Sequence, residues 1–138
     1  MSYFNIDVYS RKITTSSPDA QLWFDRGLVW TFAYHHEEAV ECFRKALEHD
    51  AKYAPALLQM AEISYSKNNY LSARAYLQRY QAAAKHIPES LWLAVRTEYA
   101  LGDNQAWGKY SMMLKNNFPN ARQTRRLQEW ESERQRRY

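Results

Sequence analysis

The residues best suited to chemistry are four in a row, His35, His36, Glu37 and Glu38. Imidazole and carboxylate groups together can bind a metal such as zinc. On a helix, however, two side chains hold one ion when they lie three or four residues apart, and adjacent side chains diverge. The spacing therefore predicts no metal site, and it places Glu37 and Glu38 in the first turn of a helix, where negative charge is favourable. A metal-dependent activity stays as an alternative.

The other reactive side chains form no catalytic set. Cys42 is the only cysteine, so no disulfide forms within the chain, and no His or Asp arrangement activates it. His49 and His86 fall near the predicted ends of helices, where positive charge is favourable. We find no Ser-His-Asp set, no Gly-rich phosphate loop and no paired carboxylates. The sequence predicts no enzyme, no catalytic residue, no cofactor and no small-molecule substrate.

Positive charge is concentrated at the C-terminal end. The chain of 138 residues has a net charge of +4, and six arginines against three glutamates give residues 121–138 a charge of +3. Such a segment can bind nucleic acid or an acidic surface, and we keep this as an alternative. The glutamates interleave with the arginines and no aromatic platform accompanies them, which is typical of a solvated terminal helix. Nucleic acid is therefore disfavoured as a partner.

Helices must position all of these residues. Only 3 Gly and 4 Pro leave few turns, which disfavours a β-sandwich. Ser17-Pro18, Pro55, Pro88 and Asp103 mark helix starts, and Gly102 marks an end. These signals predict seven helices and no strand. The predicted helices are 18 to about 34, 37–50, 55–67, 70–85, 88–102, 103–118 and 121–138.

The helices repeat in pairs. Gly27 and Ala61 are 34 residues apart, as are Ala39 and Ala73, and a third unit follows at a spacing of 33. Small residues at fixed points indicate helical hairpins whose two helices cross closely. We predict three hairpins within residues 17–120, at about 20–53, 54–87 and 88–120. An extended arm over 1–16 precedes them, with Phe4, Ile6 and Val8 alternating with polar residues.

The last segment, 121–138, is predicted to cap the array. Leu127 and Trp130 lie on one side of this helix, with charged residues elsewhere. A terminal repeat exposes an apolar face that needs a cover with a polar back. We therefore expect Leu127 and Trp130 to dock on residues such as Tyr110 and Leu114.

These residues resemble the tetratricopeptide repeat family. The first unit carries Trp23, Gly27, Trp30, Ala39 and Phe43 at the positions that define the repeat. The resemblance implies an all-α fold, an α-solenoid of three such hairpins plus the C-terminal capping helix. It also implies a non-enzymatic protein-interaction module or scaffold.

The resemblance further implies a concave binding face on the first helix of each hairpin. This face would be apolar and aromatic with two acids, suited to an apolar peptide, an amphipathic helix or a second copy of the chain. The Lys and Asn residues with which chaperone-binding relatives clamp a peptide carboxylate are missing. An open alternative is that the arm, or a second chain, buries part of this face. The expected protein-binding residues are Phe24, Leu28, Phe32, Leu58, Glu62, Tyr65, Leu91, Val95, Glu98 and Tyr99.

Two narrower resemblances divide the chain. Residues 54–120 resemble the last repeats of the pilotins PilF and PilW, type IV pilus biogenesis lipoproteins that help a secretin assemble. Residues 9–50 resemble the first repeat of other bacterial tetratricopeptide proteins. The hypothesis that follows is a chimera joined near residues 47–54, engineered as a scaffold. A pilotin-like role is the alternative.

Targeting signals are the last feature of the sequence. No apolar stretch approaches the ~20 residues that span a membrane. The sequence also shows no signal peptide and no lipidation cysteine near its start, so as written it predicts a cytoplasmic location. Relatives of the C-terminal half are instead outer-membrane lipoproteins that face the periplasm.

Overall fold

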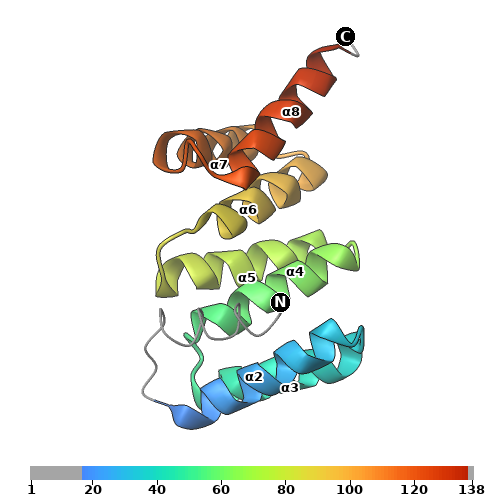
Figure 1. Cartoon of the computed structure of the whole chain (residues 1–138), viewed down its shortest axis with the longest axis vertical. Coiled ribbons are helices and arrows are strands. Elements are labelled where there is room, and N and C mark those ends of the chain that lie inside the picture. The colour runs from blue at the N-terminus through green and yellow to red at the C-terminus, as the bar shows by residue number, and fades with distance from the viewer. Residues whose placement is uncertain (1–16, 137–138) are drawn as a thin grey trace. The chain divides into compact units, whose positions relative to one another are not determined.

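The computed structural model describes residues 17–136 (Figure 1). Within that range every regular element is a helix, which confirms the all-α prediction. The predicted arm over 1–16, with Phe4, Ile6 and Val8, lies outside the described residues. The helices are α2 (Pro18–Phe32), α3 (His36–His49), α4 (Ala54–Ser66), α5 (Tyr70–Ala83), α6 (Pro88–Leu101), α7 (Asn104–Asn117) and α8 (Arg122–Arg136).

Side chains and prolines fix where the helices begin. Ser17 Oγ accepts a hydrogen bond from the Ala20 amide at 3.2 Å and caps α2. Asp103 caps α7 in the same way, accepting from the Ala106 amide at 3.0 Å. Prolines occupy the first turns of α2, α4 and α6, where a missing N–H costs nothing. The predicted helix starts at these positions are confirmed to within a residue.

The turn inside each hairpin repeats every 34 residues. Tyr34, Asn68 and Gly102 all have positive φ, at 62°, 62° and 77°. In each turn this residue donates to the carbonyl three residues back, and the next residue donates to the carbonyl five residues back. This is the Schellman pattern of helix ends. Glycine adopts it freely and asparagine tolerates it, but for a tyrosine the same backbone is strained.

The chain divides into two compact units, Met1–Ala84 and Lys85–Tyr138. In unit 1, α2 pairs with α3, α4 pairs with α5, and α3 packs on α4. Its core contains the rings of Phe24, Phe43 and Tyr53. A Cβ on Gly27 would lie 2.7 Å from Cδ1 of the Phe43 ring, so only glycine fits there. The predicted close crossing of the first two helices is confirmed at this position.

In unit 2, α8 packs on the hairpin of α6 and α7. Leu127 is fully buried with Leu91, Val95 and Leu114, and Trp130 packs against the same cluster. The predicted docking of Leu127 and Trp130 is therefore confirmed.

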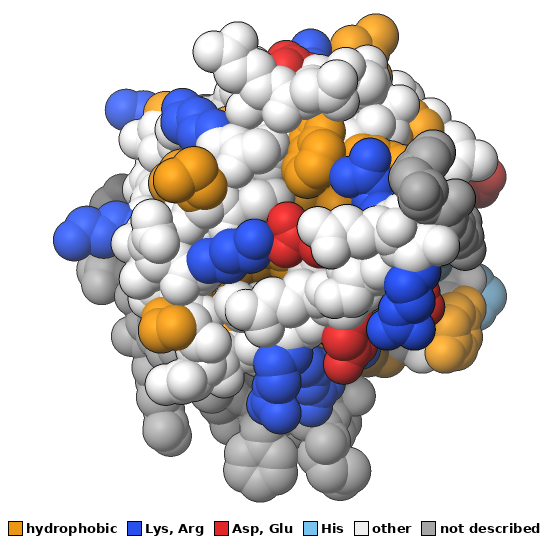
Figure 2. All heavy atoms as spheres, turned by 90° about the horizontal axis from the view of Figure 1, so that it is seen from above, with side chains coloured by type: hydrophobic (Ala, Val, Ile, Leu, Met, Phe, Trp, Pro, Cys, Tyr) orange, Lys and Arg blue, Asp and Glu red, His pale blue; other side chains and the backbone are white. Residues whose placement is uncertain are grey.

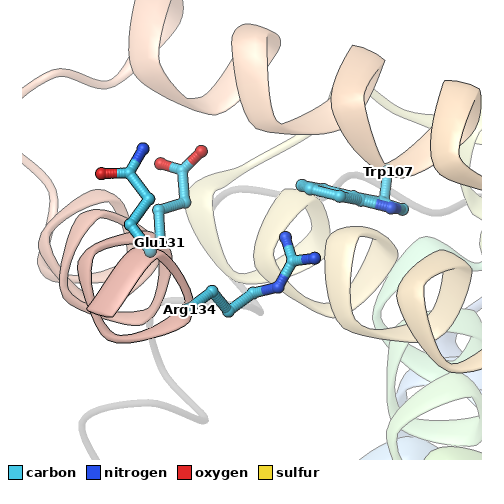
Figure 3. A pocket seen from close by; sticks show the side chains of 4 residues that line it. Trp107, Glu131 and Arg134 are labelled. Carbon is cyan, nitrogen blue, oxygen red and sulfur yellow. The ribbon is translucent and has the colours of Figure 1, made fainter. Parts of the chain in front are cut away.

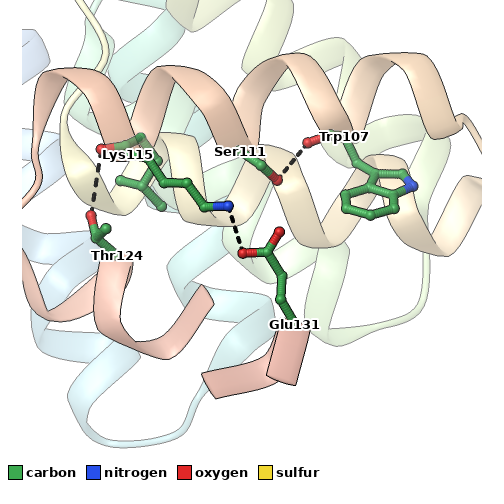
Figure 4. Close-up of polar contacts among 6 residues, drawn as sticks. Trp107, Ser111, Lys115, Thr124 and Glu131 are labelled. Atoms are coloured by element: carbon green, nitrogen blue, oxygen red, sulfur yellow. Dashed lines mark hydrogen bonds and ion pairs between the residues drawn. The ribbon is translucent and has the colours of Figure 1, made fainter. Parts of the chain in front are cut away.

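Polar contacts also hold α8 in place (Figure 4). The buried Thr124 hydroxyl donates to the Phe118 carbonyl and lies 3.4 Å from the Leu114 carbonyl. Lys115 on α7 forms an ion pair with Glu131 on α8 at 2.7 Å. The role of Thr124 could not be predicted from the sequence, because its two carbonyl partners lie outside its own helix.

Candidate binding surfaces

The structure buries most of the side chains that were expected to line a groove. Phe24 is fully buried, with its ring centroid 5.7 Å from that of Phe43 and 5.5 Å from that of Tyr53. The inward face of each first helix is filled by its neighbouring helices rather than left open to a ligand. Six of the ten expected residues are buried, and their role in binding stays a prediction: Phe24, Leu28, Leu58, Leu91, Val95 and Glu98.

The other four expected residues reach the surface. Phe32 and Tyr99 are exposed, at 43% and 42%, and Glu62 and Tyr65 are half-buried. The Tyr65 ring packs edge-on against Tyr70 at a centroid distance of 5.3 Å. Unit 1 contains Phe32, Glu62 and Tyr65, and unit 2 contains Tyr99. Their role in binding stays a prediction.

Four exposed hydrophobic side chains lie on α2 in unit 1. Leu22 and Val29 lie seven residues apart, hence on one side of the helix, with Trp30 and Phe32 on either flank. Leu22, Val29 and Trp30 are 47%, 59% and 40% exposed. We call Leu22, Val29, Trp30 and Phe32 the α2 face. Of these residues only Phe32 was predicted to bind. The signal that could have revealed the others is that α2 carries apolar residues all round, as a helix does that needs cover on several sides.

Tyr34 stands at the end of this face. It is 87% exposed and has the left-handed backbone described above. A large aromatic side chain gains nothing from burial at such a position, and its backbone costs about 1–2 kcal/mol. Strain of this kind persists mainly at functional sites.

The His35–Glu38 segment carries ordinary surface contacts. His35 Nδ1 lies 3.9 Å from the Glu38 carboxylate, with both side chains at least half exposed. The His35 ring also packs edge-on against Trp30 at 5.3 Å. Among residues 17–136, no group of three or more His, Cys, Asp or Glu side chains is placed to hold a metal ion.

In unit 2, three aromatic rings meet at a corner, and a guanidinium lies over them. The centroid distances are 4.7 Å for Tyr99–Trp130, 5.6 Å for Trp107–Trp130 and 5.7 Å for Tyr99–Trp107, and each pair is close to perpendicular. The Arg134 guanidinium carbon lies 5.1 Å from the Tyr99 centroid and 5.2 Å from each tryptophan centroid. We call Tyr99, Trp107 and Trp130 the aromatic corner.

A shallow depression adjoins the aromatic corner (Figure 3). It is lined by Trp107 from α7 and by Glu131, Arg134 and Gln135 from α8. The Arg134 side chain extends from α8 toward the Trp107 ring. Sequence reasoning placed Tyr99 in a different surface and did not connect these rings, because they come from three separate helices.

The outer face of α8 mixes charges of both signs. A second depression on this helix is lined by Arg125, Gln128, Glu129, Ser132, Glu133 and Arg136. Figure 2, which looks onto the α8 end, shows acidic side chains beside the basic ones rather than one continuous basic patch. This distribution gives little of the phosphate-tracking surface that nucleic-acid binding requires.

Burial governs the three shifted titratable groups of the described chain. It raises the pKa of the Cys42 thiol, and it raises the pKa of Tyr53 to about 12, with help from Asp25 and Asp50. It lowers the pKa of His86, and Lys109 adds to the effect. A thiol with a raised pKa is a poor nucleophile at neutral pH, so Cys42 is suited to packing.

The predicted position near a helix C-terminus is confirmed for His49 and wrong for His86. His49 lies in the last turn of α3. The helix before His86 already ends at Ala83, so His86 instead precedes α6. There its Nδ1 atom lies 2.9 Å from Ser90 Oγ, and its ring packs edge-on against Tyr110 at 5.8 Å.

Comparison with known proteins places the fold. Residues 33–99 match the tetratricopeptide repeat family. Two solved structures are similar in fold to this chain. PilF of Pseudomonas aeruginosa has 24% sequence identity and a TM-score of 0.73, over 79% of this chain and 49% of PilF. PilW, a widely conserved type IV pilus biogenesis factor, has 18% identity and a TM-score of 0.70, over 91% of this chain and 59% of PilW. A search of curated proteins gave no match.

Residues 33–99 of this chain therefore match tetratricopeptide repeats, and the two structural likenesses show a shared fold. In particular, its fold resembles that of PilF and PilW, of which it spans about half and three-fifths of the length. Proteins with these repeats bind proteins or peptides and are typically non-enzymatic interaction modules. Between residues 17 and 136, every helix falls short of the length and apolarity needed to cross a membrane.

Proposed function

We propose that this chain is a non-enzymatic protein-interaction module, and that its binding surface is the α2 face together with Tyr34. The observation that carries the proposal is the exposure of Leu22, Val29, Trp30 and Phe32 along one helix, next to an exposed aromatic residue on a strained backbone. Several large apolar side chains exposed on one side of a helix are typical of a docking surface. The ligand that fits is an apolar or amphipathic segment of a partner protein, anchored by Trp30 and Tyr34.

A peptide-display selection tests this surface. The full chain is used as bait, and selected peptides are synthesised and measured by calorimetry against wild type, Val29→Asp and the control Leu71→Asp. Leu71 lies on α5 of the same unit, outside the α2 face, and is 66% exposed against 59% for Val29. We expect Val29→Asp to weaken binding at least tenfold and Leu71→Asp to leave it unchanged. Equal affinity for all three proteins would overturn the assignment.

Self-association is the competing use of the same face. Light-scattering mass on a size-exclusion column, at several concentrations, distinguishes it. A constant mass near 16.5 kDa supports a ligand-binding surface. A mass that rises with concentration in wild type but not in Val29→Asp would mean that a second copy of the chain occupies the α2 face.

A pilotin-like role in type IV pilus secretin assembly is the second candidate, favoured by the likeness to PilF and PilW. Complementation tests it directly. The chain is expressed in a strain that lacks PilF, with a lipoprotein leader added in a parallel arm, and surface pili are scored by electron microscopy. Restored piliation in either arm supports the role, and absence of pili in both with normal protein levels contradicts it. Chimeric origin and cellular location stay predictions.

A further inference from the structure

The aromatic corner already has the geometry of a cation site. The guanidinium of Arg134 is nearly equidistant from the three ring centroids, at 5.1–5.2 Å, and the centroids lie 4.7–5.7 Å from one another. The cation therefore caps a corner where three π-systems meet. Each such ring attracts a cation within about 6 Å of its centroid.

Little besides the rings holds Arg134 in place. Within residues 17–136, no carboxylate lies within ion-pair distance of its guanidinium. The nearest candidate on the same depression, Glu131, is paired with Lys115 at 2.7 Å. Arg134 is half-buried and stands two residues before the end of α8. A half-exposed cation–π contact is weak enough for its side chain to leave and return.

The depression beside the corner offers an incoming cation a route and a second anchor. Trp107 supplies one ring, and Glu131 and Gln135 supply oxygen atoms that accept hydrogen bonds from planar N–H groups. A guanidinium suits this set better than an ammonium, because it stacks on rings and directs several donors in one plane.

We propose that the aromatic corner is a binding site for an arginine side chain of a partner protein, and that Arg134 occupies it until the partner arginine takes its place. The site lies wholly in unit 2, whereas the α2 face belongs to unit 1. The proposal of an arginine site is therefore independent of the proposed function, and disproof of one leaves the other unaffected. The apparent affinity of the site for a partner arginine equals its intrinsic affinity multiplied by the fraction of time for which Arg134 is absent from the site.

The experiment follows the tryptophan indole N–H signals of the full chain by NMR while N-acetyl-arginine amide is added. Proteins compared are wild type, Arg134→Ala, and the control Arg136→Ala, which removes an exposed arginine of the same helix. We expect Arg134→Ala to bind the probe roughly five- to thirtyfold more tightly than wild type, as the loss of a cation–π occupant implies. Arg136→Ala should match wild type, and the shifts should map to Trp107 and Trp130.

Two further arms make the outcome decisive. N-acetyl-lysine amide and tetramethylammonium are titrated into Arg134→Ala, and tighter binding of either would overturn the choice of a guanidinium. Equal affinity of wild type and Arg134→Ala, or no saturable shift in either, would overturn the proposal. If Arg134→Ala loses helix content, Arg134→Gln is used instead, since it keeps part of the apolar stem. The double variant Arg134→Ala, Trp130→Leu should lose the binding that Arg134→Ala gains.

Discussion

At the residue scale, the same left-handed backbone conformation occurs in three hairpin turns, and a different residue type adopts it in each turn. The left-handed positions of the hairpin turns hold Tyr34, Asn68 and Gly102. Only Tyr34 combines this backbone with a bulky side chain that is 87% exposed. The tyrosine therefore costs stability without contributing to the core, which is the pattern expected of a residue kept for binding.

Replacing Tyr34 by glycine tests that reasoning. We expect Tyr34→Gly to raise the free energy of unfolding by up to about 1 kcal/mol, because the strain is relieved and offsets the larger entropy of glycine in the unfolded chain. Tyr34→Ala removes the ring but keeps the strain, and should not be stabilising. Urea unfolding gives both values. A less stable Tyr34→Gly would contradict the strain argument.

Two other glycines provide a matched pair. Gly27→Ala should lower stability by about 1–3 kcal/mol, because the new methyl group overlaps the fully buried Phe43 ring. Gly108 lies inside α7 with nothing within 4 Å of a built Cβ, so Gly108→Ala should raise stability by about 0.5–1 kcal/mol. Denaturant midpoints of the two variants, compared with wild type, should therefore shift in opposite directions.

His86 makes stability depend on pH. Its pKa is lowered in the folded chain by burial and by Lys109, so the unfolded chain binds the proton first as the pH falls. Stability is thus retained above the ordinary histidine pKa of 6.5 and lost as the pH falls from there through the lowered folded value. We expect the urea midpoint of His86→Gln to fall less between pH 7.5 and 5 than that of wild type.

At the element scale, local signals predicted the helices well and predicted exposure poorly. Ser17, Pro88, Gly102 and Asp103 act on their own helix ends, so the sequence alone locates those ends. Which side of a helix stays open depends on the neighbours that cover it. Phe24 was therefore assigned to a groove that the structure fills with Phe43 and Tyr53.

The aromatic corner could not be predicted for a related reason. Tyr99, Trp107 and Trp130 belong to α6, α7 and α8, and their meeting depends on how α8 crosses the other two helices. The docking of α8 itself was predictable, because Leu127 and Trp130 are the apolar residues of an otherwise charged helix.

The burial of Leu127 by the docking of α8 predicts how much stability is lost when that side chain is shortened. Leu127→Ala should destabilise unit 2 by about 2–4 kcal/mol, because the side chain is fully buried with Leu91, Val95 and Leu114. Gln128→Ala, one residue later and exposed, should change stability by less than about 0.5 kcal/mol. Thermal unfolding followed by tryptophan fluorescence measures both, and an unchanged transition in Leu127→Ala would mean that α8 is not part of the folded core.

At the scale of the whole molecule, the division into two compact units predicts where a protease cuts first. The segment 84–87 between α5 and α6 is outside any helix and contains the exposed Lys85. Lys52 and Lys67 are also exposed, but their turns lie inside unit 1. Within residues 17–136 we expect trypsin to cut first after Lys85, giving fragments identifiable by mass spectrometry. Earlier cleavage after Lys52 or Lys67 would contradict the boundary.

The single buried thiol gives the protein a built-in reporter of local opening. Cys42 on α3 is 7% exposed, and a reagent that modifies thiols reaches it mainly while the first hairpin is transiently open. The rate of modification, compared with that of a free cysteine peptide, therefore gives the fraction of time the hairpin spends open. A ligand that binds the α2 face would slow this labelling by the same factor by which it stabilises the closed hairpin.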